Sequence, residues 1–332
     1  MIPDYIYAHA LDEDWVKNNP RIVNLLAATR TKSDLLRRTR AFVDPKPGQV
    51  DRLIYDCKET TKAPSDPTAT DAGTASTDGN VLHLLKQAKD IDEANSDVMG
   101  RNGWGNKGND HICLCNYDKN YNNAFFDGTK FTFGNGDGVI FVDLGKCRDV
   151  HAHEYGHGYV QTTSGSRYFG ESGALNEHVA DVHGIVLDAY LDKKKISEQT
   201  WLIGAGCIAD QAKSEGWKAI RTCTTEKAYP RDPQPKFMKD KRLGEIEISD
   251  NFGVHIWSGI LNHAFMQYAT KQESKEYLHD GLMQVFALAA AQCGPLGGFR
   301  KYSQALQKVC NEREPKTSSA LVAALKHVQL IK

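Results

Sequence analysis

The stretch DVHAHEYGHGYV, residues 149–160, constrains the fold more than any other part of the 332-residue chain. It holds three histidines and one glutamate within seven positions. On a helix, side chains four residues apart lie on one face, whereas side chains two apart point about 200° away from each other. His153 and His157 can therefore bind one metal ion, while His151 faces elsewhere and is expected to be a bystander, in an outer position or at the surface. The remaining pattern is H-E-x-x-H, made by His153, Glu154 and His157.

Such a metal site needs a helix and a third ligand, and the segment ESGALNEHVAD offers both. Glu177 and Asp181 lie four residues apart on one helical face, after enough chain for a loop and a return helix. Two histidines and a glutamate are a ligand set of catalytic zinc, which keeps one position for a water of lowered pKa. Asp181 can accept a hydrogen bond from the far nitrogen of a ligating histidine. An acidic face exposed to solvent is the alternative, which the apolar residues of this segment disfavour.

Composition excludes other classes of protein. The formal net charge is −1 and charges of both signs are interspersed, so nothing indicates a nucleic-acid groove or a membrane surface. No apolar run approaches the length of a membrane span, and the acidic N-terminus lacks the apolar core of an ordinary signal peptide. The eight cysteines include no C-x-x-C pair. Cys113 and Cys115 are expected to pack in the core or to form separate bridges.

Along the chain, strand signals precede helix signals. Residues 14–38 are predicted to be helical and are followed by a Pro/Gly-rich linker, AFVDPKPGQ. Strands are then expected at 50–57, at 111–117 and within 122–144, with a polar turn-rich stretch at 58–80 and a helix at 81–94. From residue 148 the period is helical, in the segments 148–163, 173–191, 253–271, 277–293, 299–312 and 318–331. This order predicts an α+β protein.

Four segments resemble the thermolysin-like zinc metallopeptidases in order and spacing: YNNAFFDGTKFTFGNGDG, DVHAHEYGHGYV, YFGESGALNEHVADVHG and DNFGVHIWSGILN. The resemblance covers most of residues 50–332. It implies a two-lobed α+β fold with the zinc site in the cleft between the lobes. The implied divisions are a short pro-segment-like region at 1–49, a strand-rich N-terminal catalytic lobe at 50–163 that includes the HExxH helix, and a helical C-terminal catalytic lobe at 164–332.

The resemblance implies a zinc-dependent metalloendopeptidase with one catalytic zinc ion, bound by His153, His157 and Glu177. Glu154, on the same helix, would be the general base that takes a proton from water. Further catalytic residues would stabilise the oxyanion: Tyr168 and His255 as donors, with Asp250 orienting His255. A zinc-binding protein without peptidase activity is the rival interpretation.

Other matching residues would bind the substrate. Asn123 and Ala124 match the edge strand that pairs with the substrate backbone, and Arg221 matches the arginine that binds a substrate carbonyl, with an ordinary surface arginine as the alternative. The pocket for the residue after the scissile bond would be apolar, which predicts cleavage on the amino side of bulky hydrophobic residues. Its predicted lining is Phe141, Leu144, Val150 and Ile220.

The family's calcium sites match only in part. Asp149 and Asp188 keep their carboxylates, but Thr200, Leu202 and Ala205 stand at further positions of the cluster. Calcium favours six to eight oxygen ligands, so calcium binding is doubtful. Disulfides would replace calcium as a source of stability if the compartment is oxidising.

The N-terminal segment begins MIPDYIY and resembles the pro-segment of protealysin-like members. Besides protein and peptide substrates, the expected partner of the active site is therefore this segment, acting as its inhibitor. A helical extension that packs permanently on the surface is the alternative. We expect secretion by a route without an ordinary signal peptide, with a cytoplasmic regulated peptidase as the alternative.

Overall fold

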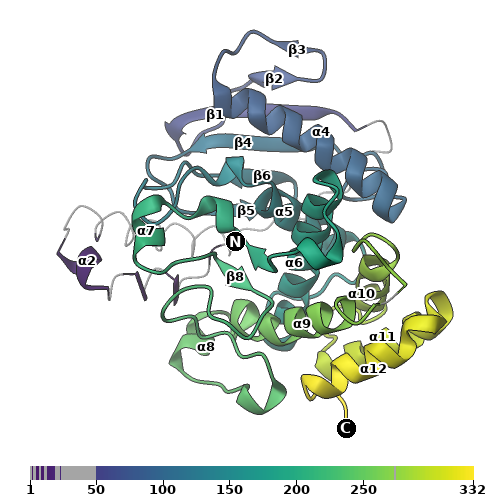
Figure 1. Cartoon of the computed structure of the whole chain (residues 1–332). Coiled ribbons are helices and arrows are strands. Elements are labelled where there is room, and N and C mark those ends of the chain that lie inside the picture. Colours follow the sequence, from purple (N-terminus) through teal and green to yellow (C-terminus); the bar gives the residue numbers. More distant parts are fainter. Residues whose placement is uncertain are drawn as a thin grey trace.

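A computed structural model describes residues 2, 5, 6, 9, 10, 13–18, 23, 50–272 and 274–332. Its largest sheet has the strand order β3-β2-β1-β4-β6-β5 (Figure 1). The strands are β1 (Arg52–Thr60), β2 (Ala69–Thr70), β3 (Gly73–Thr74), β4 (His111–Tyr117), β5 (Ala124–Phe126) and β6 (Lys130–Phe133).

The parallel pairing of neighbouring strands explains why a long helix connects two of them. Strand β4 runs parallel to both β1 and β6, whereas β5 is antiparallel to β6. Parallel neighbours need a crossover connection, and α4 (Gly79–Met99) provides the one between β1 and β4. The helix begins where Asp78 accepts hydrogen bonds from the backbone of Asn80 and Val81, and it ends at Gly100 in the left-handed region, with φ of 64°.

The predicted strands at 50–57, 111–117 and within 122–138 and the helix at 81–94 are confirmed. Two features differ from the prediction. The polar stretch 58–80 contains β2 and β3, in which Ala69 is buried by pairing with β1. Residues 139–144 form no regular strand, because Phe141 makes only a single bridge, to Ile208.

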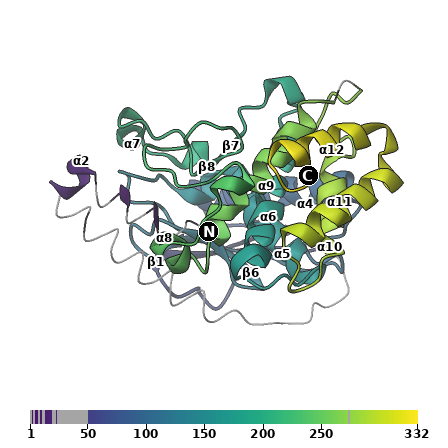
Figure 2. The same ribbon diagram turned by 90° about the horizontal axis from the view of Figure 1, so that it is seen from below.

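The six helical segments predicted from residue 148 onward are also confirmed. They are α5 (Arg148–Thr162), α6 (Gly170–Leu191), α9 (Val254–Ala269), α10 (Leu282–Ala291), α11 (Phe299–Arg313) and α12 (Ser318–His327). Shorter elements between α6 and α9 are β7 (Leu202–Ile203), α7 (Asp210–Ser214), β8 (Arg221–Thr222) and α8 (Glu245–Ser249). In both views α10, α11 and α12 gather at one end of the molecule, away from β1 (Figures 1 and 2).

Helices α5 and α6 pack unusually closely because glycines lie where they meet. A Cβ on Gly156 would lie 2.7 Å from the Cα of Ala180, and a Cβ on Gly184 would lie 2.6 Å from the backbone oxygen of Asp149. Real side chains do not approach so closely, so any larger residue would push the helices apart. Residues 150–160 of α5 are therefore buried without exception.

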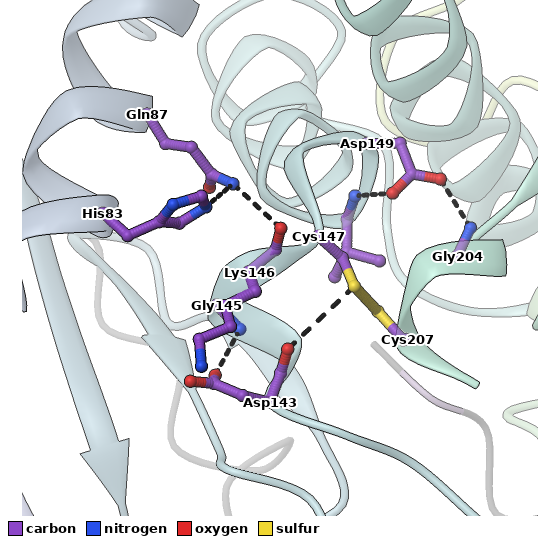
Figure 3. The surroundings of a disulfide bond; sticks show 10 residues. His83, Gln87, Asp143, Gly145, Lys146, Cys147, Asp149, Gly204 and Cys207 are labelled. Atoms are coloured by element: carbon purple, nitrogen blue, oxygen red, sulfur yellow. Dashed lines mark hydrogen bonds between the residues drawn. A yellow bond between two sulfur atoms is a disulfide. The ribbon is translucent and has the colours of Figure 1, made fainter. Parts of the chain in front are cut away.

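One disulfide, Cys147–Cys207, joins the start of α5 to the 3₁₀ turn Ala205–Cys207 (Figure 3). The remaining six cysteines are buried and free. Cys113 and Cys115 therefore lie in the core, as one of the two predictions had it, and neither forms the separate bridge that was the alternative.

Little of the N-terminal segment belongs to the described residues. Helix α2 (Asp14–Lys17) lies at the start of the helix predicted for 14–38. Most of that predicted helix, and the linker AFVDPKPGQ, lie outside the described residues. None of the helices in the described part of the chain combines the length and apolar character that a membrane span requires.

Candidate active site

Packing of α5 on α6 brings the three predicted zinc ligands together. His153 Nε2 lies 3.5 Å from Glu177 Oε2, and His157 Nε2 lies 3.4 Å from Glu177 Oε1. A tetrahedral zinc ion with Zn–N bonds near 2.0 Å separates its ligand atoms by about 3.3 Å, so these distances suit a shared ion. Glu177 is fully buried, and its Oε2 accepts no hydrogen bond from any described residue. The residues therefore fit the metal.

Hydrogen bonds from neighbouring residues turn both histidines toward this point. His153 Nδ1 lies 2.8 Å from Asp181 Oδ1, and His157 Nδ1 lies 2.8 Å from Asn176 Oδ1. Both partners are acceptors, so each Nδ1 carries the proton and each Nε2 presents its lone pair to the metal position. Asp181 lies where the sequence placed it, whereas Asn176 was missed. Its position in ALNEH, directly before Glu177, is the signal that could have revealed it.

Arg221 completes this network in a way the sequence did not indicate. It is 3% exposed, so the ordinary surface arginine is ruled out. Its Nε donates to Asp181 Oδ2 at 3.0 Å, and its Nη2 donates to Oδ1 at 2.5 Å. Burial alone would raise the pKa of Asp181, but Arg221 and His153 hold that pKa well below its usual range. Asp181 is therefore an anion that binds both Arg221 and His153.

The predicted oxyanion donors lie on the other side of Glu177. The Tyr168 hydroxyl donates to Glu177 Oε1, and it lies 2.8 Å from His255 Nε2. His255 Nδ1 donates to Asp250 Oδ1 at 2.6 Å, while Asp250 Oδ2 accepts from the backbone nitrogen of His255 at 2.8 Å. Asp250 therefore accepts one bond from the ring and one from the backbone of His255, which orients the ring so that Nε2 lies 3.4 Å from Glu177 Oε1.

The N-terminal segment reaches the same site. Ile2 is 1% exposed, and its backbone nitrogen donates to Asn123 Oδ1 at 2.6 Å. Ile2 also helps line a small cavity beside the predicted metal ligands and base. Its other lining residues are Ala124, Val150, His153, Glu154, Ile203, Ile220 and Arg221.

Six predicted site residues thus line this cavity beside α5. Ile203 lines it as well, and the sequence gave no sign of that. Phe141 and Leu144, predicted for the same pocket, are fully buried but are not among its lining residues.

Comparison with known proteins identifies the family. The sequence profile of the catalytic domain of thermolysin metallopeptidases matches residues 54–161, and that of their alpha-helical domain matches residues 164–329. The chain belongs to the thermolysin metallopeptidase family. It is 31% identical to Protease PrtS of Photorhabdus sp. (strain Az29) over 282 residues, which are 82% of this chain and 75% of PrtS.

Two further thermolysin-family relatives agree. An extracellular metalloprotease of Pectobacterium carotovorum subsp. carotovorum is 36% identical over 51% of this chain and 48% of its own length. The precursor of protealysin, a metalloproteinase from Serratia proteamaculans, shares the fold with a TM-score of 0.85 and 25% identity, over 100% of this chain and 99% of that one. The predicted resemblance and the thermolysin-like fold are thus confirmed.

Replacing Asp181 with Asn should test the buried network. Arg221 would lose its charged partner in the interior, so the free energy of unfolding should fall by about 3–5 kcal/mol. Loss of the carboxylate behind His153 should weaken zinc binding by about 10–100-fold. Denaturant titration and metal-buffer titration measure the two effects.

The control is Glu226→Gln, which removes the partner of Lys218 in an exposed ion pair. It should leave the free energy of unfolding nearly unchanged, because water screens exposed ion pairs. Equal effects of the two substitutions would contradict the network.

Proposed function

We propose that the protein is a zinc-dependent metalloendopeptidase that cleaves proteins on the amino side of bulky hydrophobic residues. The observation that carries the proposal is the convergence of His153, His157 and Glu177, with the Glu154 carboxylate 3.9 Å from His157 Nε2. Bound by these three ligands, zinc would supply a Lewis acid that polarises the scissile carbonyl and activates water.

The chain's own residues account for the proton transfers. Glu154 takes a proton from the water whose oxygen attacks the carbonyl carbon, and later delivers that proton to the leaving amine as the C–N bond breaks. Tyr168 and His255 donate hydrogen bonds to the oxygen that becomes negative, and Asp250 keeps His255 oriented for this role. Asn123 and Ala124, at the edge of the sheet, would pair with the substrate backbone.

The apolar lining beside Glu154 supports the proposed specificity. Val150, Ile203 and Ile220 surround the position of Ile2, so the site already accommodates a branched aliphatic side chain. A hydrophobic pocket distinguishes side chains by only about 1–3 kcal/mol per methylene, so the preference should be broad. The proposal for this pocket rests on Val150 and Ile220, with Arg221 at its margin as the group that binds a substrate carbonyl.

Cleavage of a mixed peptide library tests the function. The protein should hydrolyse bonds before Leu, Ile, Phe or Val, and a zinc chelator should stop it. Glu154→Gln should bind zinc as before but lose nearly all hydrolysis, because the proton acceptor is gone. A wild-type protein that is equally inert would support the zinc-binding protein without activity, and a library dominated by Asp, Glu or Lys would refute the apolar pocket.

We further propose that residues 1–49 form a pro-segment that inhibits the enzyme. Ile2 lines the cavity beside His153 and Glu154, in the region where a substrate side chain would bind. Tyr5 is also buried, and burial followed by the charge of Asp250 raises its pKa, so it lies within electrostatic reach of the catalytic residues. A tethered segment reaches a millimolar effective concentration at its own site, so weak contacts are enough for inhibition.

Self-cleavage tests this proposal. The wild-type protein should shorten itself within RAFVDPKPGQVDR and gain activity, while Glu154→Gln should stay full length. Ile2→Asp should weaken docking in the apolar cavity and raise the activity of the uncut chain. Full activity in an uncut wild-type protein would refute inhibition by the segment and support a permanently packed extension. Identical trimming of a Glu154→Gln variant purified free of other proteases would refute self-cleavage.

We propose that Arg148 and the Cys147–Cys207 disulfide together replace calcium at the family's calcium position. Arg148 Nε donates to Asp188 Oδ1 at 2.8 Å, and its Nη2 bonds Asp192 Oδ1 at 2.5 Å. Asp149 Oδ2 accepts from the backbone of Gly204 at 2.6 Å, beside the disulfide (Figure 3). The guanidinium thus supplies positive charge that calcium would bring.

The disulfide also supports secretion, because such bonds persist in oxidising compartments. The extracellular relative agrees with this proposal.

Calcium removal and reduction should act differently on stability. A calcium chelator should leave the melting temperature unchanged. Replacing both Cys147 and Cys207 with Ala should lower the free energy of unfolding by about 2–4 kcal/mol, since the bond closes a long loop. A reductant should destabilise the wild type and leave the double variant unaffected. Strong destabilisation by the chelator would overturn the proposal. So would eight titratable thiols in wild-type protein that is unfolded without a reductant.

A further inference from the structure

A second cluster of metal-binding side chains lies on the opposite side of α5 from the catalytic residues. His111 and Cys113 come from β4, and His151 comes from the first turns of α5. All three are fully buried, and their ligand atoms lie within 4.8 Å of one another. His151 is thus directed away from the catalytic metal, as helix geometry predicts. The surface position expected as one alternative is wrong, because β4 and α4 cover the side chain.

The Nδ1 nitrogen of His151, on the outer side of the cluster, is fixed as a hydrogen-bond donor. Gln87 donates from its amide nitrogen to the Lys146 backbone oxygen at 3.2 Å and to His83 at 2.9 Å (Figure 3). Only its amide oxygen is left to face His151 Nδ1, at 3.1 Å. His151 Nδ1 therefore carries the proton, and its Nε2 presents a lone pair.

His111 is fixed in the same way by a carboxylate. Its Nδ1 lies 3.1 Å from Asp92 Oδ2, which also accepts from Arg52 Nε at 2.9 Å. Asp92 Oδ1 accepts from the Tyr155 hydroxyl at 2.9 Å. A carboxylate that receives all these donors acts as an acceptor, so His111 Nδ1 also carries the proton. Carboxylates and carbonyls behind the outer nitrogen are the usual partners of metal-binding histidines.

The two inner nitrogens therefore face each other with lone pairs. His111 Nε2 lies 2.8 Å from His151 Nε2, and Cys113 Sγ lies 3.7 Å from His151 Nε2. Two lone pairs at this distance repel unless a cation lies between them. That cation is either an extra proton or a metal ion. A tetrahedral ion separates two nitrogens by about 3.3 Å and a nitrogen and a sulfur by about 3.6 Å. The sulfur distance already fits, and the nitrogens need to part by about 0.5 Å.

The sulfur of Cys113 distinguishes a metal ion from a proton. Arg52 is shared by Asp92 and Asp71, so these three side chains carry one net negative charge, which attracts either an extra proton on the histidine pair or a metal ion. Rings of Phe131 and Phe133 pack against the histidines with centroids 4.7 Å and 4.8 Å apart, which keeps the cluster apolar on that side. A shared proton needs only the two nitrogens, whereas a metal ion also uses the Cys113 sulfur, 3.7 Å from His151 Nε2, whose proton is released to solvent on binding.

We propose that His111, Cys113 and His151 form a second metal site for a thiophilic ion, separate from the catalytic zinc. Imidazole and thiolate ligands suit Cu⁺ and Zn²⁺. Three protein ligands in a closed interior favour Cu⁺ over Zn²⁺, which almost always takes a fourth ligand. The ion would fasten the central strand β4 to the helix that carries His153 and His157.

Metal content of the full chain tests the site, in the Glu154→Gln background so that the chain is not trimmed. Protein produced with both copper and zinc in the medium should contain two metal ions per chain by elemental analysis. Adding Cys113→Ser should remove one ion and leave the catalytic zinc. The matched control Cys115→Ser, two residues along the same strand, should keep both ions, because Cys115 Sγ bonds only the Tyr55 backbone oxygen in the described structure.

X-ray absorption of the Glu154→Gln chain without any cysteine substitution gives a second readout, which does not depend on the folding of the serine variants. The copper edge should show one sulfur and two nitrogen neighbours. One ion per chain, unchanged by Cys113→Ser, would overturn the second site and leave a shared proton. A second ion that is zinc and requires Cys113 would confirm the site and overturn the preference for Cu⁺.

Discussion

The close contact between α5 and α6 is the constraint on which the rest of the active site depends. His153 and His157 come from one helix and Glu177 from the other, and metal sites tolerate ligand displacements of only about 0.2 Å. Gly156 lets the helices meet, since a Cβ there would lie 2.7 Å from Ala180 Cα. The glycine inside the H-E-x-x-H motif thus sets the distance between the proposed metal ligands, although it is not one of them.

This close contact buries charge, and the buried charge is compensated locally. Asp181, Glu177 and Arg221 are all at most 3% exposed. Burying a single ion costs several kcal/mol, and a partner repays this cost only where its geometry is good. The two-point bond of Arg221 to Asp181 meets that condition, and His153 donates to the same carboxylate. The network therefore holds His153, the first proposed metal ligand, in one orientation without a metal, which reduces the cost of ordering the site.

Local patterns predicted the elements well but not what lies between them. The helical period from residue 148 onward predicted six helices, because burial of one helical face leaves a signal within the segment itself. Strands β2 and β3 were missed, since they are short and polar and exist only through pairing with β1. For His151 the direction was predictable from helix geometry, whereas its burial was not. The residues that cover it, Gln87 and His111, come from segments far away in the sequence.

Helix α5 is held from both sides by polar contacts, which explains how a helix with so many polar residues can be buried. Buried polar groups need partners, and a rotation about the helix axis would separate them. On one side His153 and His157 bond to Asp181 and Asn176, and on the other side His151 bonds to Gln87. Apolar packing alone would tolerate small rotations, because it has no direction. Hydrogen bonds on opposite faces do not tolerate them, so the angle at which His153 and His157 face Glu177 is set by residues outside the catalytic site as well as within it.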